Sequence, residues 1–352
     1  MRGHAILLAG VLFSCRLWGA EPALTLIYAS PYSPNHTFSM ADRIWMKWVE
    51  EHSNARLRIR PIWSGALLSS DQSMLELRHG IADIGLITPI YTRGGVQLIR
   101  AQAGFYGGAK TFEQQVAMYR CLSADSADSA EFERELRGLK VLAIQGGTLP
   151  GVLTRTRPVS TLADLRGLRL RAPIELLGVL RDLGADPVNM PMGEVYSALA
   201  KGVLDGVIAP ADTLKSLHFA EVAKHFWRLE IPRGAYPARA MAMRRWLELS
   251  EQDRAVLEAS TPIWEQALAA QTLAAVQAGE IAGRAQGVVF TPVAPQDQQR
   301  FDALYEADSA RSALQLERYG ISAQQTFLDA RAIAGSIEAS GQVRCLNAHP
   351  AR

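Results

Sequence analysis

The sequence predicts an α/β protein made of two similar lobes, and three observations support this. The 352 residues, 48% of them hydrophobic, are enough for about two domains of ~100–200 residues each. Short β-prone runs alternate with segments of helical period, which is typical of βαβ units and a largely parallel sheet. One helix-to-strand unit occurs twice in the chain, and we interpret the copies as one in each lobe.

The first elements can be placed one by one. The β-prone runs Leu24–Ala29 and Leu57–Ile62 predict strands. The segments Ser39–Glu51 and Asp71–His79 have helical period, and Asp71 is a suitable N-cap for the second of these helices. Strand, helix and strand in such short steps imply parallel pairing within one sheet.

The repeated unit is a helix that ends at a glycine, followed three residues later by an aspartate and then by an apolar run. Such a glycine suits a left-handed helix cap, and the apolar run suits a buried strand. Because Gly-x-x-Asp is also a common turn, coincidence is the alternative explanation. The two copies are Met74–Ile87, with Gly80 and Asp83, and Glu194–Ala209, with Gly202 and Asp205.

The predicted organisation has an export signal, two lobes, a set of long helices and a tail. Long helices are expected after Leu247, where the sequence becomes rich in Ala, Gln and Glu at helical period and can clasp both lobes. The second lobe is expected to begin near the β-prone run Leu139–Ile144. The ranges are 1–20 for the signal, 21–145 for lobe 1, 146–232 for lobe 2, 233–340 for a crossover strand and the long helices, and 341–352 for the tail.

The N-terminus resembles an export signal. A short basic start precedes the apolar run Ala5–Cys15, which is too short to span a bilayer as a permanent helix. A buried N-terminal helix is the alternative. Leu12–Cys15 partly matches a lipoprotein cleavage box, so lipid anchoring at Cys15 stays open. We therefore expect a periplasmic protein.

Export also changes how the cysteines are interpreted. Removal of the signal leaves Cys121 and Cys345, an even pair in an oxidising compartment. We predict a disulfide between them, with two free buried thiols as the alternative.

Composition and motifs exclude several functions. The formal charge of +2, from 37 basic and 35 acidic residues, leaves no broad basic field for nucleic acid. The chain has no CxxC pair for zinc, no GxSxG elbow and no HExxH helix. We expect no cofactor and no nucleic-acid partner.

Arg171 is the candidate ligand-binding residue. It ends an apolar strand immediately before Ala172 and Pro173, and proline stops the ladder of the strand there. In open α/β sheets this carboxyl end faces the ligand crevice. A planar guanidinium can hold a carboxylate by two parallel hydrogen bonds. A surface ion pair is the alternative role.

Several segments together resemble one known family, the substrate-binding proteins of tripartite ATP-independent periplasmic (TRAP) transporters of the dicarboxylate-receptor (DctP) type. The likeness runs from about Leu24 to Ser340. The segments are Ser64–Leu67, Gly80–Gly85, Asp164–Pro173, Leu183–Val188, Met190–Tyr196 and Gly202–Gly206.

The resemblance implies a periplasmic-binding-protein fold. Two α/β lobes joined by a hinge, with a long helix across both and extra C-terminal helices, would close around an organic acid. The receptor would then deliver the acid to a sodium-driven TRAP permease, and would not itself be an enzyme. We expect a monomer. An exported receptor that signals to a sensor protein, and an exported enzyme on a similar fold, are the competing functions.

The resemblance also implies roles for single residues. Arg171 matches the carboxylate-binding arginine of the family, and Thr88, Tyr91 and Met192 fall at positions that commonly line the cleft. The other candidates for the site are Tyr28 and Ala209.

Two departures from the family pattern bear on the ligand. Ala209 stands before Pro210 where the family often has a ligand-binding asparagine, and the stretch Gly146–Gly151 lacks a second arginine that several members have nearby. The pocket is therefore expected to be less polar than in members that bind sialic acid or dicarboxylates. This predicts a monocarboxylate with an apolar or aromatic body.

Overall fold

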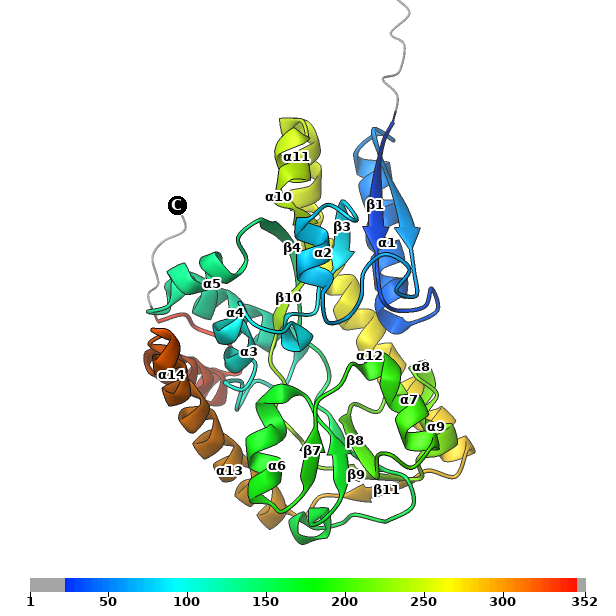
Figure 1. The fold of residues 1–352 in the computed structure, drawn as a ribbon, viewed down its shortest axis with the longest axis vertical. Helices are drawn as coiled ribbons and strands as arrows, with labels where there is room; N and C mark the ends of the chain where they lie inside the picture. Colours follow the sequence, from blue (N-terminus) through cyan, green and yellow to red (C-terminus); the bar gives the residue numbers. More distant parts are fainter. Residues whose placement is uncertain (1–22, 347–352) are drawn as a thin grey trace, which may run out of the picture.

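The computed structural model describes residues 23–346, and within this range the chain forms two α/β lobes, each built on its own sheet (Figure 1). The predicted signal at 1–20, the possible lipidation site Cys15 and the end of the tail lie outside the described residues. None of the described helices is long and apolar enough to cross a membrane.

The sheet of the first lobe has the strand order β2-β1-β3-β10-β4. Strand β1 pairs in parallel with β2 and β3, and the late strand β10 lies antiparallel between β3 and β4. The predicted strands at Leu24–Ala29 and Leu57–Ile62 are β1 and β2. The bounds are β1 (Leu24–Ala29), β2 (Leu57–Ile62), β3 (Ile84–Leu86), β4 (Leu139–Gln145) and β10 (Tyr236–Ala242).

The sheet of the second lobe has the order β11-β9-β5-β8-β6-β7. Strand β6 lies in parallel between β7 and β8, so that its carboxyl end shares an edge with theirs. Strand β5 is antiparallel to β8 and β9. The bounds are β5 (Gly151–Thr154), β6 (Arg169–Arg171), β7 (Asp186–Val188), β8 (Gly206–Ala209), β9 (His225–Arg228) and β11 (Val289–Pro292).

The described chain passes between the sheets at residues 146–150, at residues 229–235 and along helix α12 (Thr261–Ala285). Trp264 of α12 stacks on Trp45 in the first lobe, with ring centroids 3.6 Å apart. Further along α12, a Cβ built on Gly279 would lie 2.1 Å from the carbonyl oxygen of Ala211 in the second lobe, so only glycine allows this contact. Helix α12 is therefore packed on both lobes.

The two copies of the repeated unit have the same turn and the same hydrogen bond to a neighbouring strand. Gly80 and Gly202 have positive φ angles of 77° and 70° after their helices. Asp83 accepts a hydrogen bond from the backbone NH of Ile27 on β1, and Asp205 accepts one from the NH of Arg169 on β6, each at 2.7 Å. In each lobe the aspartate thus ties the turn to the neighbouring parallel strand.

Short helices cover the two sheets. The sequence predicted helix α1 correctly but misplaced the start of helix α2. The segment Ser39–Glu51 is in α1, but Asp71 is not an N-cap. Helix α2 starts two residues later, and the Glu76 carboxylate holds the turn before it by accepting from the NH and hydroxyl of Ser69. The helices of the first lobe are α1 (Thr37–His52), α2 (Ser73–Arg78), α3 (Gln97–Gln102), α4 (Phe112–Asp125) and α5 (Ser129–Glu135); those of the second are α6 (Leu177–Asp182), α7 (Met192–Ala200), α8 (Thr213–Ser216) and α9 (Phe219–Val222).

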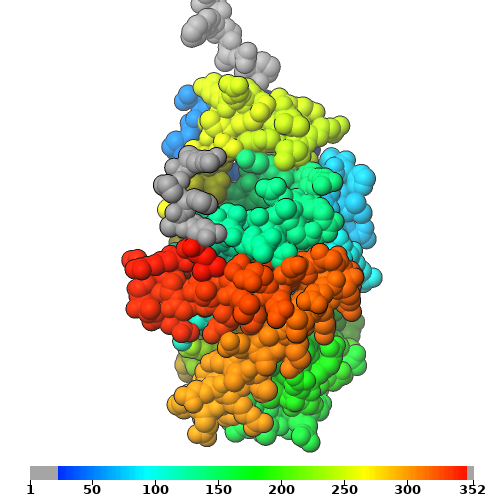
Figure 2. All heavy atoms as spheres, turned by 90° about the vertical axis from the view of Figure 1, so that its left-hand side faces the viewer, coloured from blue at the N-terminus to red at the C-terminus, as the bar shows by residue number. Residues whose placement is uncertain are grey.

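The C-terminal helices join the lobes on a second side. Figure 2 shows the orange and red segment, mainly α13 and α14, crossing the molecule between the teal first lobe and the green second lobe. On α13, the Asp308 carboxylate accepts from the NH of Val179 in the second lobe, and the neighbouring Ser309 hydroxyl donates to the carbonyl of Gly104 in the first. The bounds are α10 (Met243–Glu248), α11 (Glu251–Ala259), α13 (Pro295–Leu314) and α14 (Ala323–Ser340).

A disulfide links Cys121 on α4 to Cys345 just beyond α14, as the cysteine arithmetic predicted, with 5.1 Å between their Cα atoms. The bond closes a loop of 224 residues. A double Cys121→Ala, Cys345→Ala variant should therefore lose about 2–4 kcal/mol of unfolding free energy. Urea denaturation of both proteins measures this, and an unchanged midpoint would show that the bond does not stabilise the fold.

Candidate functional site

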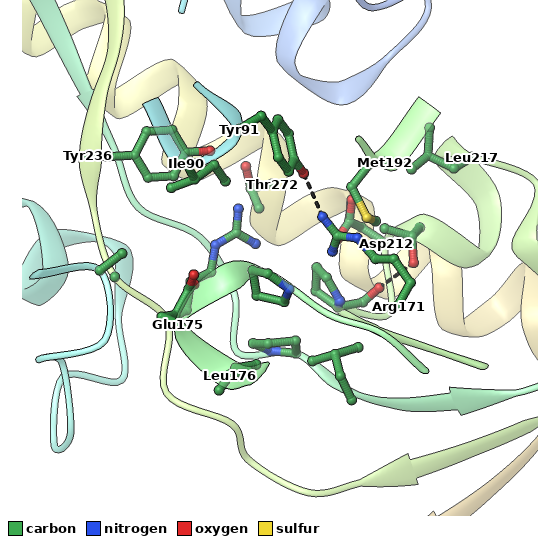
Figure 3. A pocket seen from close by; sticks show the side chains of 18 of the residues that line it. Ile90, Tyr91, Arg171, Glu175, Leu176, Met192, Asp212, Leu217, Tyr236 and Thr272 are labelled. Carbon is green, nitrogen blue, oxygen red and sulfur yellow. Dashed lines mark hydrogen bonds between the residues drawn. The ribbon is translucent and has the colours of Figure 1, made fainter. Parts of the chain in front are cut away.

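A cavity of about 100 Å³ lies between the lobes and is lined by both (Figure 3). This is the scale of a compact ligand, since a cavity of about 150 Å³ in another protein holds benzene. The first lobe contributes Ile90 and Tyr91, the second contributes Met192 and Leu217, and α12 contributes Thr272. Most of these walls are apolar.

Arg171 reaches this cavity from the carboxyl end of β6, and its side chain is buried. Its Nε donates to the carbonyl of Met190 at 2.9 Å, and its Nη2 donates to the hydroxyl of Tyr91 at 2.7 Å. Because Tyr91 belongs to the first lobe, the second bond joins the lobes across the cleft (Figure 3). The remaining nitrogen, Nη1, has no hydrogen bond to any described residue, which leaves a fixed cationic donor for a ligand.

The structure brings together three of the six predicted site residues. Arg171, Tyr91 and Met192 all line the cavity. The other three, Tyr28, Thr88 and Ala209, lie outside its lining. Tyr28 is in the interior of the first lobe, where its hydroxyl donates to Asp42.

Thr88 and Ala209 are likewise held by their own lobes. The NH of Thr88 donates to the Ser73 hydroxyl at 3.1 Å, and the Thr88 hydroxyl donates to the Ser70 carbonyl. Ala209 pairs with Gly151 in the second sheet and packs in the core on the face of β8 opposite to that of its neighbour Ile208, which lines the cavity. The alternation of side chains along a strand accounts for this difference.

Most of the chain matches one protein family. The sequence model of the DctP family, described as bacterial extracellular solute-binding protein family 7, matches residues 28–315. The chain belongs to this family. Its members are periplasmic solute-binding proteins of TRAP transporters that work with membrane permease subunits, and they are not enzymes.

Relatives of this DctP-family receptor are distant in sequence. An uncharacterised protein of Haemophilus influenzae is 23% identical over 267 residues, or 75% of this chain and 78% of the relative. Two other solute-binding relatives are matched over only 36% and 51% of their own length. The sequence comparison therefore supports the family more strongly than any one ligand.

Solved structures share the fold of the receptor. A TRAP solute-binding protein of Rhodoferax ferrireducens, in complex with copurified benzoate, has a TM-score of 0.82 at 21% identity, covering 91% of this chain and all of that one. A second, from Chromohalobacter salexigens with bound D-glucuronate, has a TM-score of 0.74 at 20% identity, covering 87% and 99%. The same architecture thus holds acids of different character.

Sequence reasoning missed a second arginine of the receptor's cleft. Arg233, from the segment between β9 and β10, lines the cavity, and a Cβ built on Gly147 would lie 2.5 Å from its Cζ. The Gly146–Gly151 stretch has no arginine of its own, but Arg233 reaches this stretch from a remote part of the chain. The paired glycines at 146 and 147, which leave room for a large side chain, were the available signal.

Two carboxyl groups were also missed, Glu175 after β6 and Asp212 after β8. Burial raises the pKa of both, to about 6 for Asp212, while nearby Arg233 opposes the shift in each case and Arg171 also opposes it for Glu175. His36, which lines the same cavity, has its pKa lowered to about 3 by burial and then by Arg239, so it is neutral. The cavity is therefore lined by two guanidinium groups and by two carboxyl groups whose pKa values are raised by burial.

Proposed function

We propose that this TRAP receptor binds a monocarboxylate with an apolar or aromatic body in the cleft between its lobes, acts as a monomer, and delivers the acid to its permease. The observation that carries this proposal is the buried Arg171 guanidinium, which is held by Met190 and Tyr91 and keeps Nη1 for a ligand. A carboxylate there gains charge-assisted hydrogen bonds in a site shielded from water.

The charge balance of the cleft supports one carboxylate rather than two. Arg171 and Arg233 share the cavity with the acidic side chains Glu175 and Asp212, and His36 adds no charge. A monocarboxylate brings one further negative charge into this closed site, whereas a dicarboxylate brings two. Burying the second unpaired charge is costly.

The walls support an apolar body. Besides Ile90, Met192 and Leu217, the rings of Tyr236 and Phe38 line the cavity, and aromatic surfaces contribute large contact areas. Micromolar binding corresponds to about −8 kcal/mol, whereas a hydrogen bond to a charged group contributes roughly 1.5–3 kcal/mol. Packing around the ligand body must therefore supply much of the affinity. The benzoate found in the Rhodoferax relative is an acid of this kind.

A thermal-shift panel followed by calorimetry tests the proposal. Benzoate and phenylacetate are expected to raise the melting temperature and to bind with one-to-one stoichiometry, and glucuronate and succinate are expected to bind at least tenfold more weakly. Native mass spectrometry of the purified protein should show an acid of the same class. If glucuronate or succinate stabilised the protein most, the proposed ligand class would be wrong.

A further inference from the structure

Three buried polar atoms in the cleft have no hydrogen-bond partner among the described residues: Asp212 Oδ1, the Thr272 hydroxyl on α12 and Glu175 Oε2. The other Asp212 oxygen, Oδ2, receives only a long hydrogen bond, 3.3 Å, from the Ser216 hydroxyl. Asp212 and Thr272 are more than nine-tenths buried, at 6% and 4% exposure, whereas Glu175 is only partly buried. Leaving such groups unpaired costs stability, so an unpaired set in a binding cavity indicates a missing partner.

The fold places Asp212 beside the proposed carboxylate site. Strands β6 and β8 are parallel neighbours, with Arg171 paired to Val207. Arg171 ends β6, and Asp212 follows the end of β8, so both side chains arise at the same edge of the sheet. Figure 3 shows Asp212 on the Arg171 side of the pocket, and Thr272 between Ile90 and Arg171 in that view. One compact ligand can therefore meet the guanidinium and the carboxylate together.

A hydroxyl group suits Asp212 better than an ammonium group does, because of the charge of the cleft. Either group could donate to the Asp212 carboxylate, and the Thr272 hydroxyl can donate or accept. Arg233 is the charged group that most opposes the raised pKa of Asp212, so the cleft already holds a cation near this carboxylate, and a neutral donor avoids adding a second one.

We propose that the ligand carries a hydroxyl group, separate from its carboxylate, that donates a hydrogen bond to Asp212. The ligand class is then a hydroxylated apolar or aromatic monocarboxylate, and this inference rests on the proposed function. Arg171 holds the carboxylate, and Asp212 accepts from the hydroxyl.

Calorimetry on the unmodified protein gives the first test. The probes are benzoate with its 2-, 3- and 4-hydroxy isomers, and phenylacetate with mandelate. At least one hydroxylated acid should bind roughly ten- to hundredfold more tightly than its parent, because hydrogen bonds to charged groups have this strength. The matching methyl ether, which cannot donate, should lose the gain. If a parent acid binds and no hydroxylated partner binds more tightly, the inference fails while the proposed function stands; if no acid binds, the proposed function fails.

Variants give the second test. In Asp212→Ala the affinity ratio between the hydroxylated acid and its parent should fall towards one while the parent still binds. Asp186→Ala is the matched control, since Asp186 is an exposed aspartate outside the cavity lining, and it should leave the ratio unchanged. Glu175→Gln tests the competing acceptor, because Glu175 also has a buried unpaired oxygen in this cavity. Loss of the preference in Glu175→Gln instead of Asp212→Ala would overturn the assignment, as would tightest binding by the amino-substituted analogue.

The pH dependence of the affinity ratio tests whether Asp212 acts as an ionised acceptor. Since burial raises the pKa of Asp212 to about 6, its ionised, accepting form prevails above that pH. The preference for the hydroxylated acid should therefore be larger at pH 7.5 than at pH 5. The groups that act on Asp212 are Arg233 and Ser216, with Arg171, Glu175 and Thr272 in the same cavity. Measuring in Glu175→Gln removes the other carboxyl with a raised pKa, and a preference that grows at pH 5 would contradict the proposal.

Discussion

Replacing Arg171 with lysine should weaken binding of the acid at least tenfold, and replacing it with alanine should weaken binding about a hundredfold or more. Lysine keeps the charge, but one ammonium cannot occupy the positions of Nε and Nη2, which contact the Met190 carbonyl and the Tyr91 hydroxyl, together with that of Nη1, which we propose for the ligand. Alanine removes the hydrogen bonds altogether, each worth roughly 1.5–3 kcal/mol. Isothermal titration calorimetry with the best acid of the panel measures both losses.

Arg169 provides a matched control on the same strand. Its side chain is 52% exposed and makes only a long contact, 3.8 Å, with Asp186. Arg169→Lys should leave the affinity unchanged, because solvent screens such a pair. If Arg171→Lys bound the acid as tightly as the unmodified protein, Arg171 would have to be removed from the site.

Replacing Asp42 with alanine should cost about 3–5 kcal/mol of unfolding free energy, the largest stability loss that we expect in this fold. Asp42 and Arg239 form an ion pair whose side chains are both 0% exposed, with 3.0 Å between Oδ1 and Nε. The same carboxylate accepts from the indole NH of Trp264 at 2.8 Å and from the Tyr28 hydroxyl. Removing it leaves a buried guanidinium without its counter-charge.

Urea denaturation measures this loss against an exposed pair. Glu50 and Arg58 are 50% and 62% exposed, so Glu50→Ala should change the unfolding free energy by less than about 1 kcal/mol. Equal midpoints for the two variants would contradict the role given to Asp42. The network connects α1, β1, β10 and α12. Its loss should therefore lower the free energy of cooperative unfolding of the whole first lobe, and not only fray the end of one helix.

Local patterns predicted much of the scaffold. The strands β1 and β2, the helix α1 and the repeated Gly-x-x-Asp units could be found because hydrophobic period and helix caps are properties of neighbouring residues. Arg171 could be found for the same reason, since its place between a strand and a proline is a local feature. The disulfide followed from the number of cysteines and the expected compartment.

The rest of the site depends on contacts that no local pattern encodes. Arg233 reaches the space over Gly147 from another segment, and Asp212 enters the cleft only because β8 lies next to β6. Ala209 is close to the cleft in the chain but is not part of it. Successive side chains of a strand point to opposite faces of the sheet, and the side chain of Ala209 is on the face that packs in the core. Tyr28 is likewise committed to the buried network around Asp42.

The hydrogen bond between Arg171 and Tyr91 joins the lobes through the same guanidinium that we propose for the solute. A solute bound there would change the electrostatic surroundings of this bond, so that binding would be coupled to the arrangement of the lobes. A permease that recognised this arrangement would need no contact with the solute, and the receptor alone would select it.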